Sequence, residues 1–225
     1  MFIEIGNKAI ARNNRFTIAL SGGSTPKLLF QTLASEEFRS QIDWAKTSFF
    51  FGDERHAPPD SAESNYRMAR ENLFDPLEIP EGNAYRWSTE WQNAEEIAFD
   101  YEKTLIEFFK TKNPRFDLIL LGMGADAHTA SLFPETTALT ETEKLAVSNW
   151  VPKLDTSRLT FTFPLINNAA NIVFLVAGAE KAETLKTILK GEFQPLKFPA
   201  QAVKPQDGEL LWFVDKTAAK LIESD

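Results

Sequence analysis

The chain of 225 residues contains no cysteine and only two histidines, His56 and His128. Without cysteine it cannot form a disulfide framework, a thiolate zinc site or a cysteine nucleophile. Two histidines so far apart in the sequence, with no cysteine between them, match no familiar spacing of metal ligands. We therefore expect no metal site.

Basic residues and long apolar segments are also scarce. Lysine and arginine number 24 against 32 acidic residues, which gives a net charge of -8. This balance argues against a broad basic face for nucleic acid or a membrane surface, but not against a small anion held by a few local cations. No stretch of about 18 apolar residues occurs, and the amino terminus lacks the basic and apolar regions of a signal peptide. A cytoplasmic location is the default expectation.

Hydrophobic residues are plentiful. They make up 43% of the chain and include 19 phenylalanines and 5 tryptophans, whereas 25% of the residues are charged. This composition is typical of a folded globular protein. No internal repeat, low-complexity tract or linker divides the chain, so we expect one α/β domain over residues 1–225.

Apolar segments that read as strands alternate with segments of helical periodicity. We expect buried strands at 15–20, 47–51, 116–121, 172–177 and 210–214, half-exposed strands at 144–151 and 158–163, and a short strand at 84–87. Helices are expected at 2–12, from Pro26 onward, and at 63–74, 94–112, 178–190 and 215–222. Such alternation predicts a parallel or mixed sheet that is covered by helices on both faces.

The first of three unusual loops follows the strand at 15–20 and reads Ser21-Gly-Gly-Ser-Thr-Pro-Lys27. A glycine loop that leads into a helix presents free N–H groups and the positive end of the helix dipole, which suits a phosphate. The alternative is a tight turn with a serine cap. The spacing matches neither the P-loop nor the dinucleotide-binding motif, so a nucleotide is not indicated.

The other two loops follow the strands at 47–51 and 116–121. One, Gly52-Asp-Glu-Arg-His56, is either part of a site or a solvated charged turn. In the other, an apolar strand stops at Gly122, and Asp126 and His128 follow before a helix-forming segment. In open sheets ligands bind beyond the carboxyl ends of the strands, so we expect the three loops to line one pocket.

These loops together resemble the 6-phosphogluconolactonase family, within the wider group that includes glucosamine-6-phosphate deaminase. The matching stretches are Ser21–Lys27, Gly52–Arg55 with Ser64–Tyr66, and Gly122–Asp126 with His128–Pro134; weaker matches are Trp150–Pro152, Arg158–Thr160 and Gly178–Lys181. The resemblance implies a Rossmann-like α/β fold of the NagB/RpiA/CoA-transferase-like type, with a mostly parallel sheet flanked by helices on both faces. It also implies hydrolysis of 6-phospho-D-glucono-1,5-lactone in the oxidative pentose phosphate pathway, without a metal or organic cofactor.

The reaction needs an anion cradle and a base that activates water. A histidine suits the second task, because an unperturbed pKa of about 6.5 leaves the neutral ring available to accept a proton. We expect His128 to be this base, Asp126 to orient its ring or stabilise its cation, and Arg55 to bind the phosphate or the lactone oxygen. The competing interpretation is that His128 caps the next helix. The remaining candidates for binding substrate or phosphate are Ser21, Gly22, Gly23, Ser24, Thr25 and Asp53. The family pattern further implies Arg158 and Lys181 as cationic partners of the phosphate. No Gly-x-Ser-x-Gly elbow is present, so direct attack by water is simpler than a serine nucleophile.

Two features depart from the family pattern. Ala127 stands where glycine is usual, and if that position needs a positive φ, alanine costs about 1 kcal/mol and shifts His128. The segment before Phe16 is one helix long, so an edge strand is missing or the start is truncated. We therefore keep two alternatives open, a sugar-phosphate deaminase or isomerase and a catalytically silent sugar-phosphate binding protein. The expected partner is a small phosphosugar lactone, without nucleic acid or membrane, for a monomer or weak homo-oligomer.

Overall fold

The computed structural model describes residues 1–222. The helices are α1 (Phe2–Asn13), α2 (Ser24–Leu33), α3 (Asn65–Ala69), α4 (Ala94–Phe109), α5 (Phe163–Ile166), α6 (Ala182–Lys190) and α7 (Lys216–Ala219). The strands are β1 (Phe16–Leu20), β2 (Thr47–Phe51), β3 (Asp53–Arg55), β4 (Leu118–Leu121), β5 (Ala146–Val151), β6 (Thr156–Phe161), β7 (Asn171–Val176) and β8 (Glu209–Val214). The one-turn helices η4 (Thr137–Thr140), η5 (Pro152–Leu154), η6 (Ala179–Lys181) and η7 (Pro199–Ala202) lie in the connections, and a π-helical turn, Arg70–Phe74, extends α3.

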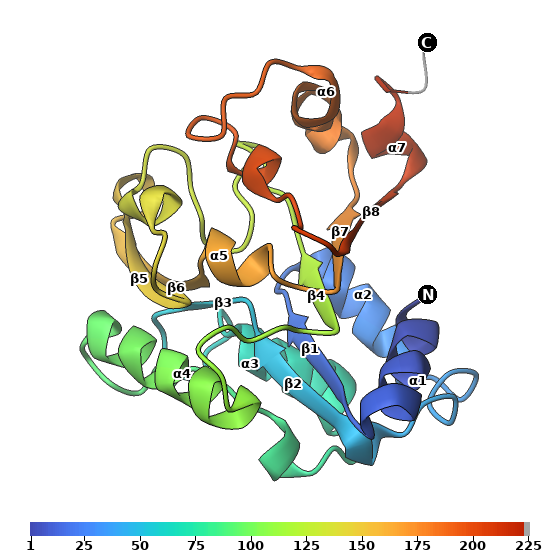
Figure 1. The fold of residues 1–225 in the computed structure, drawn as a ribbon. Coiled ribbons are helices and arrows are strands. Elements are labelled where there is room, and N and C mark those ends of the chain that lie inside the picture. The colour runs from blue at the N-terminus through green and yellow to red at the C-terminus, as the bar shows by residue number, and fades with distance from the viewer. Residues whose placement is uncertain (223–225) are drawn as a thin grey trace.

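A parallel sheet of five strands forms the centre, in the order β2-β1-β4-β7-β8. Every residue of β1 and β4 is buried, as the continuous apolar segments predict for strands covered on both faces. In Figure 1, β5, β6 and α4 lie on one side of this sheet and α1 and α2 on the other. The predicted Rossmann-like fold is confirmed. The strand order reverses between β1 and β4, where such sheets form a crevice at their carboxyl edge.

The half-exposed strands form a separate antiparallel sheet in the order β3-β6-β5. Its edge strand, β3, comes from the segment 52–56, which we interpreted as either a site loop or a solvated turn. The interpretation as a solvated turn is wrong, because Asp53 and Glu54 are buried against other parts of the chain. Asp53 and Glu54 therefore belong to a strand, and both are buried in the protein.

The helix expected directly after His128 is absent, so His128 does not cap a helix. Residues 122–136 instead form an irregular loop that contains one isolated bridge, between Thr129 and Leu132, and three positive φ angles, at Ala127, Ala130 and Glu135. Side chains of L-residues disfavour that conformation, so a regular helix cannot pass through these positions. The expected strand at 84–87 is also wrong, since only Ala84 forms a bridge, with Phe49.

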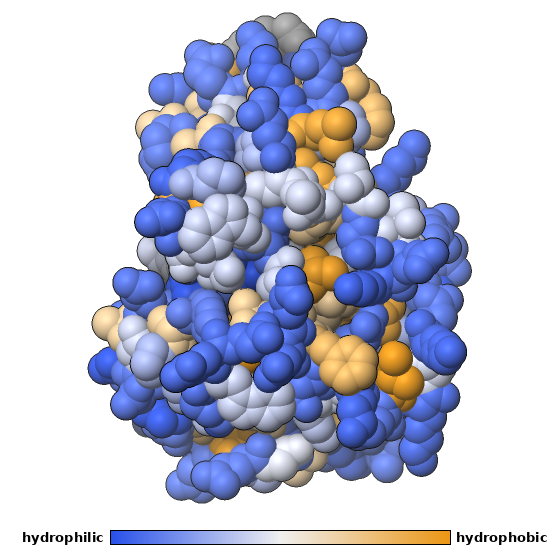
Figure 2. Space-filling model, turned by 90° about the vertical axis from the view of Figure 1, so that its left-hand side faces the viewer, coloured by the Kyte–Doolittle hydropathy of each residue, from blue (hydrophilic) through white to orange (hydrophobic). Residues whose placement is uncertain are grey.

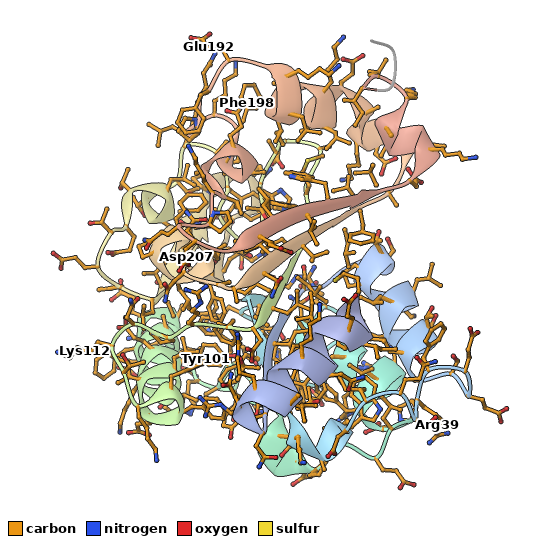
Figure 3. All side chains as sticks on the ribbon, turned by 45° about the vertical axis from the view of Figure 1, so that its right-hand side comes forward. Arg39, Tyr101, Lys112, Glu192, Phe198 and Asp207 are labelled. Carbon is orange, nitrogen blue, oxygen red and sulfur yellow. The ribbon has the colours of Figure 1, made fainter. Side chains whose placement is uncertain are left out.

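Aromatic side chains fill the space between the two sheets and α4. Tyr101 of α4 is buried and stacks on Trp87, with ring centroids 3.8 Å apart. Its hydroxyl donates a hydrogen bond to the carbonyl of Tyr85 and accepts one from the backbone N–H of Phe51. Figure 3 shows Tyr101 in the interior, whereas Arg39, Lys112 and Glu192 lie at the periphery. These contacts hold the end of β2 in place and so help to position β3.

Hydrophilic residues predominate on the face shown in Figure 2, where hydrophobic residues form small separate groups. Across residues 1–222, no helix is long and apolar enough to cross a membrane.

Candidate active site

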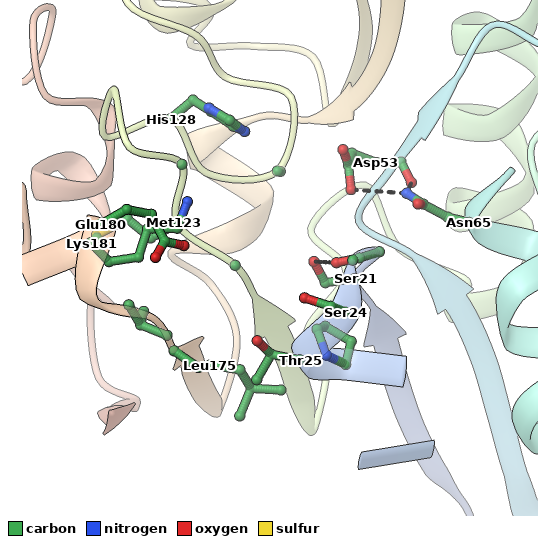
Figure 4. Close-up of a pocket in the computed structure, with 18 of the residues that line it drawn as sticks. Ser21, Ser24, Thr25, Asp53, Asn65, Met123, His128, Leu175, Glu180 and Lys181 are labelled. Atoms are coloured by element: carbon green, nitrogen blue, oxygen red, sulfur yellow. Dashed lines mark hydrogen bonds between the residues drawn. The ribbon is translucent and has the colours of Figure 1, made fainter. Parts of the chain in front are cut away.

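The candidate site lies where β1, β2, β4 and β7 end at the same edge of the parallel sheet. A cavity of about 300 Å³ opens there, between the loops that follow β1 and β4. Figure 4 shows His128 and Lys181 on one side of it, with Asp53 and Asn65 on the opposite side. Its lining includes Ser21, Gly22, Gly23, Ser24, Thr25, Asp53, Arg55, Asn65, Gly122, Gly124, His128, Ala130, Glu180 and Lys181.

The loop between β1 and α2 forms the floor of this cavity. Gly23 has a φ of 105°, a conformation that favours glycine, and it precedes the first turn of α2. No side chain among residues 1–222 caps that turn, so its N–H groups remain free to bind an anion. Gly22 has no room for a side chain, because a methyl group there would overlap the amide of Asn65. This loop therefore offers backbone N–H groups and a helix N-terminus to an anion.

Asn65, at the start of α3, joins Asp53 and Arg55 of β3. Its Nδ2 donates to the carbonyl oxygen of Asp53 at 2.9 Å, and its Oδ1 accepts from Nη1 of Arg55 at 2.7 Å. Asp53 also accepts a 2.7 Å hydrogen bond from the hydroxyl of Ser131, and Arg55 donates to the carbonyl of Glu63. Asp53 and Arg55 are thus held in fixed positions at the cavity wall.

Buried Glu54, between these two residues, anchors the turn from β3 to α3. Its carboxylate accepts hydrogen bonds from the backbone N–H groups of Arg55, Asn65 and Tyr66, at 2.8 to 2.9 Å, and from the hydroxyl of Ser64 at 3.2 Å. Burial raises the pKa of Glu54, and the three backbone N–H donors oppose that change. Glu54 therefore ties the end of β3 to the start of α3, which carries Asn65.

A second cavity of about 480 Å³ adjoins the first and shares with it Asp53, Arg55, His128 and Ala130. Asp126, Phe133, Lys153 and Arg158 line only this second cavity. Arg158 is half-buried, and its pKa is lowered by burial and by the neighbouring charge of Arg55. The structure thus places Arg158 beside Arg55, its partner across β3 and β6.

The imidazole of His128 is held on one edge and on one face. Its Nδ1 lies 2.5 Å from Oδ1 of Asp126, and since a carboxylate only accepts, Nδ1 carries the proton. Its ring stacks on Phe133, with centroids 4.1 Å apart and 25° between the planes. No residue within 1–222 makes a hydrogen bond to Nε2, whose lone pair is therefore available as a base.

Burial lowers the pKa of His128 to about 4. The carboxylate of Asp53 opposes this shift, whereas the cations Lys181, Arg158 and Arg55 add to it. The ring is therefore neutral at neutral pH, as a general base must be.

Ala127 does adopt a positive φ, of 66°, so the condition for backbone strain is met. The loop tolerates it through two backbone hydrogen bonds, from Ala200 to the carbonyl of Ala127 and from Ala127 to the carbonyl of Gly124. His128 nevertheless lines the cavity and pairs with Asp126. The alanine therefore does not displace His128 from the site.

The predicted site residues all line these two adjoining cavities; only Asp126 and Arg158 are absent from the first. The sequence analysis missed the side chains that hold them: Glu54, Asn65, Ser131, Phe133 and Lys153. Glu54, Asn65, Ser131 and Phe133 lie in the motif stretches that carry the resemblance, but the contacts that they make join distant segments. Across residues 1–222, no group of three or more histidine, aspartate or glutamate side chains is arranged to hold a metal ion.

Comparisons with known proteins agree with this architecture. Residues 1–212 match the family described as glucosamine-6-phosphate isomerases/6-phosphogluconolactonase. The chain is 47% identical to a 6-phosphogluconolactonase of Synechocystis sp., over 95% of this chain and 87% of that protein. It is 41% identical to that of Haemophilus influenzae, over 93% of this chain and 89% of the relative. The solved 6-phosphogluconolactonase of Trypanosoma cruzi superimposes with a TM-score of 0.86 at 31% identity, covering 97% of this chain and 89% of that one. The chain therefore belongs to the glucosamine-6-phosphate isomerase/6-phosphogluconolactonase family.

Proposed function

We propose that this protein is a 6-phosphogluconolactonase, which hydrolyses 6-phospho-D-glucono-1,5-lactone to 6-phospho-D-gluconate in the oxidative pentose phosphate pathway. Its relatives at 41–47% identity carry that name over nearly the whole chain. The observation that carries the mechanism is the pairing of His128 with Asp126 at the wall of a cavity whose floor is an uncapped helix N-terminus.

The phosphate of the substrate binds in the loop between β1 and α2. The backbone N–H groups of residues 22–25 and the hydroxyls of Ser24 and Thr25 donate to its oxygens, and Lys181 supplies a positive charge from η6. Arg158, which lines the adjoining cavity, acts together with its neighbour Arg55. Asp53 accepts hydrogen bonds from the sugar hydroxyls.

His128 activates the water that attacks the lactone. Nε2 accepts a proton from water as the oxygen bonds to C1 of the ester, while Asp126 holds Nδ1–H and stabilises the imidazolium. Arg55 stabilises the negative charge that develops on the carbonyl oxygen. The bond from C1 to the ring oxygen then breaks, and the imidazolium returns the proton to that oxygen. The products are a carboxylic acid, which releases its proton to solvent and becomes a carboxylate, and a free hydroxyl, with no change in oxidation state.

The test is hydrolysis of freshly prepared lactone, with the spontaneous rate subtracted at every pH. We expect wild type to be much faster than the spontaneous reaction and His128→Ala to lose about 10² to 10⁴-fold in kcat. His56→Ala is the matched control. His56 is the only other histidine in the sequence, lies outside both cavities and forms a hydrogen bond with the carbonyl of Trp91. A wild-type rate equal to the spontaneous rate would refute the proposal, and release of ammonia from glucosamine 6-phosphate would favour the deaminase alternative.

A further inference from the structure

Lys153 was not among the predicted site residues, but its ammonium contacts two of the groups that hold His128. It lies in η5, the turn that joins β5 to β6 in the antiparallel sheet. Its side chain is half-exposed and lines the second cavity. The ammonium forms an ion pair with Oδ2 of Asp126 and lies 4.6 Å from the ring centroid of Phe133.

These two partners are the same two groups that support His128. Oδ1 of Asp126 holds Nδ1 of the imidazole, and the ring of Phe133 covers its face at 4.1 Å. Lys153 therefore contacts both supports of the imidazole at once. An ordinary surface ion pair contributes little to stability. Such a pair also has no need of an aromatic ring beside the ammonium.

We infer that Lys153 is a positioning residue for the Asp126–His128 pair. Its ammonium fixes Oδ2 of Asp126, so that Oδ1 remains directed at Nδ1 of His128. It also offsets the charge of Asp126, so that the carboxylate orients the imidazole without strongly favouring its protonated form. Part of the inference, the effect on turnover, rests on the proposed function.

Besides Asp126 and Lys153, five charged residues within 1–222 line the two cavities around His128. Asp53 and Arg55 lie on β3, Arg158 on β6, and Lys181 on η6, next to Glu180, which lines the same cavity. Lys153 differs from these cations because it acts on the imidazole through Asp126. Its removal should therefore matter only while the carboxylate of Asp126 is present.

The first experiment is an NMR titration of the His128 imidazole, which does not depend on activity. The His56→Asn background leaves one histidine in the chain, so the signal needs no further assignment. In that background Lys153→Met should raise the pKa of His128 by about one unit, because the charge of Asp126 is no longer offset. Lys153→Arg should leave the pKa near its original value. The control is Lys197→Met, which removes a lysine that lies 5.3 Å over Phe198 and touches neither cavity.

The second experiment is kinetic. Lys153→Met should lower kcat about 10-fold, with a smaller change in KM, and Lys153→Arg should restore most of the rate. In an Asp126→Asn background the same substitution should cause no further loss. An unchanged His128 pKa in a folded Lys153→Met protein, or equal losses with and without Asp126, would overturn the inference. If the wild type does not hydrolyse the lactone, the proposed function fails, and the titration still decides the role of Lys153.

Discussion

Arg55 and Arg158 stand directly opposite each other in the antiparallel pair of β3 and β6. Like charges at such positions repel, and the pKa of Arg158 is lowered by burial and by the charge of Arg55. Neither guanidinium forms an ion pair with a carboxylate within residues 1–222, although Arg55 is held by Asn65 and Glu63. An anion bound between the two guanidinium groups would relieve this repulsion. The planar, forked N–H donors of a guanidinium group bind such an anion well.

We expect inorganic phosphate to stabilise the protein partly through this arginine pair. Arg158→Met should raise the midpoint of thermal unfolding in phosphate-free buffer, because it removes a half-buried charge that faces another of the same sign. It should also reduce the stabilisation by phosphate, which for a site at 100 times its Kd is about 2.7 kcal/mol. Thermal unfolding with and without phosphate measures both effects. Arg115→Met, at an exposed ion pair with Asp207, is the control, and an undiminished phosphate effect in Arg158→Met would contradict the prediction.

The lowered pKa of His128 predicts a rate that is insensitive to mild acid. In the free enzyme kcat/KM should stay level from pH 7 down to about 5 and fall with an apparent pKa of about 4, where the imidazole becomes protonated. Lys181→Met should move this fall to higher pH, because Lys181 is one of the cations that lower the pKa. A profile of kcat/KM against pH, corrected for spontaneous hydrolysis, measures it. A fall centred at pH 6.5 in wild type would show that burial does not perturb His128.

The same shift makes folding stability depend on pH. The folded-state pKa of about 4 lies below the unfolded value of about 6.5, so between these values the unfolded chain binds more protons. The contribution of His128 to stability should therefore rise as the pH increases from about 4 to 6.5 and then level off. Denaturant unfolding at several pH values should show a shallower rise in His128→Asn than in wild type. Equal slopes in the two proteins would contradict this prediction.

Gly124 should be required for the placement of the base. A methyl group at this position would overlap Nδ1 of His128 and would come within 2.5 Å of Oδ1 of Asp126. Gly124→Ala should therefore lower kcat about 10²-fold by displacing the imidazole. Gly82→Ala is the matched control, because nothing lies within 4 Å of a methyl group there. Near-normal turnover in Gly124→Ala would show that the base need not occupy the position seen here.

Glu54 should matter for stability as well as for the site. In Glu54→Gln one acceptor oxygen becomes an NH₂ group that faces an N–H donor of Arg55, Asn65 or Tyr66. We expect a loss of about 2 kcal/mol in the free energy of unfolding, since a buried donor is left without a partner. Glu71→Gln, at an exposed ion pair with Arg67, should change stability little. Denaturant unfolding compares the two variants, and equal effects would refute the structural role of Glu54.

The sequence by itself determined the order of the elements and the loops that carry the site. Long apolar segments such as 116–121 and helical periodicities such as that of 94–109 are local patterns, and local patterns decide whether a segment is a strand or a helix. Because parallel strands end at one edge of their sheet, the loops at 21–27, 52–56 and 122–128 could be expected to meet before any coordinates were known.

Only the tertiary structure decided how the side chains of those loops are held. The charged segment at 53–55 became a buried strand because β6 pairs with it. The loop after His128 stayed irregular because its bonding partners lie as far away as Leu196, which accepts a hydrogen bond from Glu135. Lys153 reached the Asp126–His128 pair only because the β5–β6 hairpin folds against the loop after β4. Such contacts depend on which distant segments share a surface, and neither residue spacing nor local propensity records that.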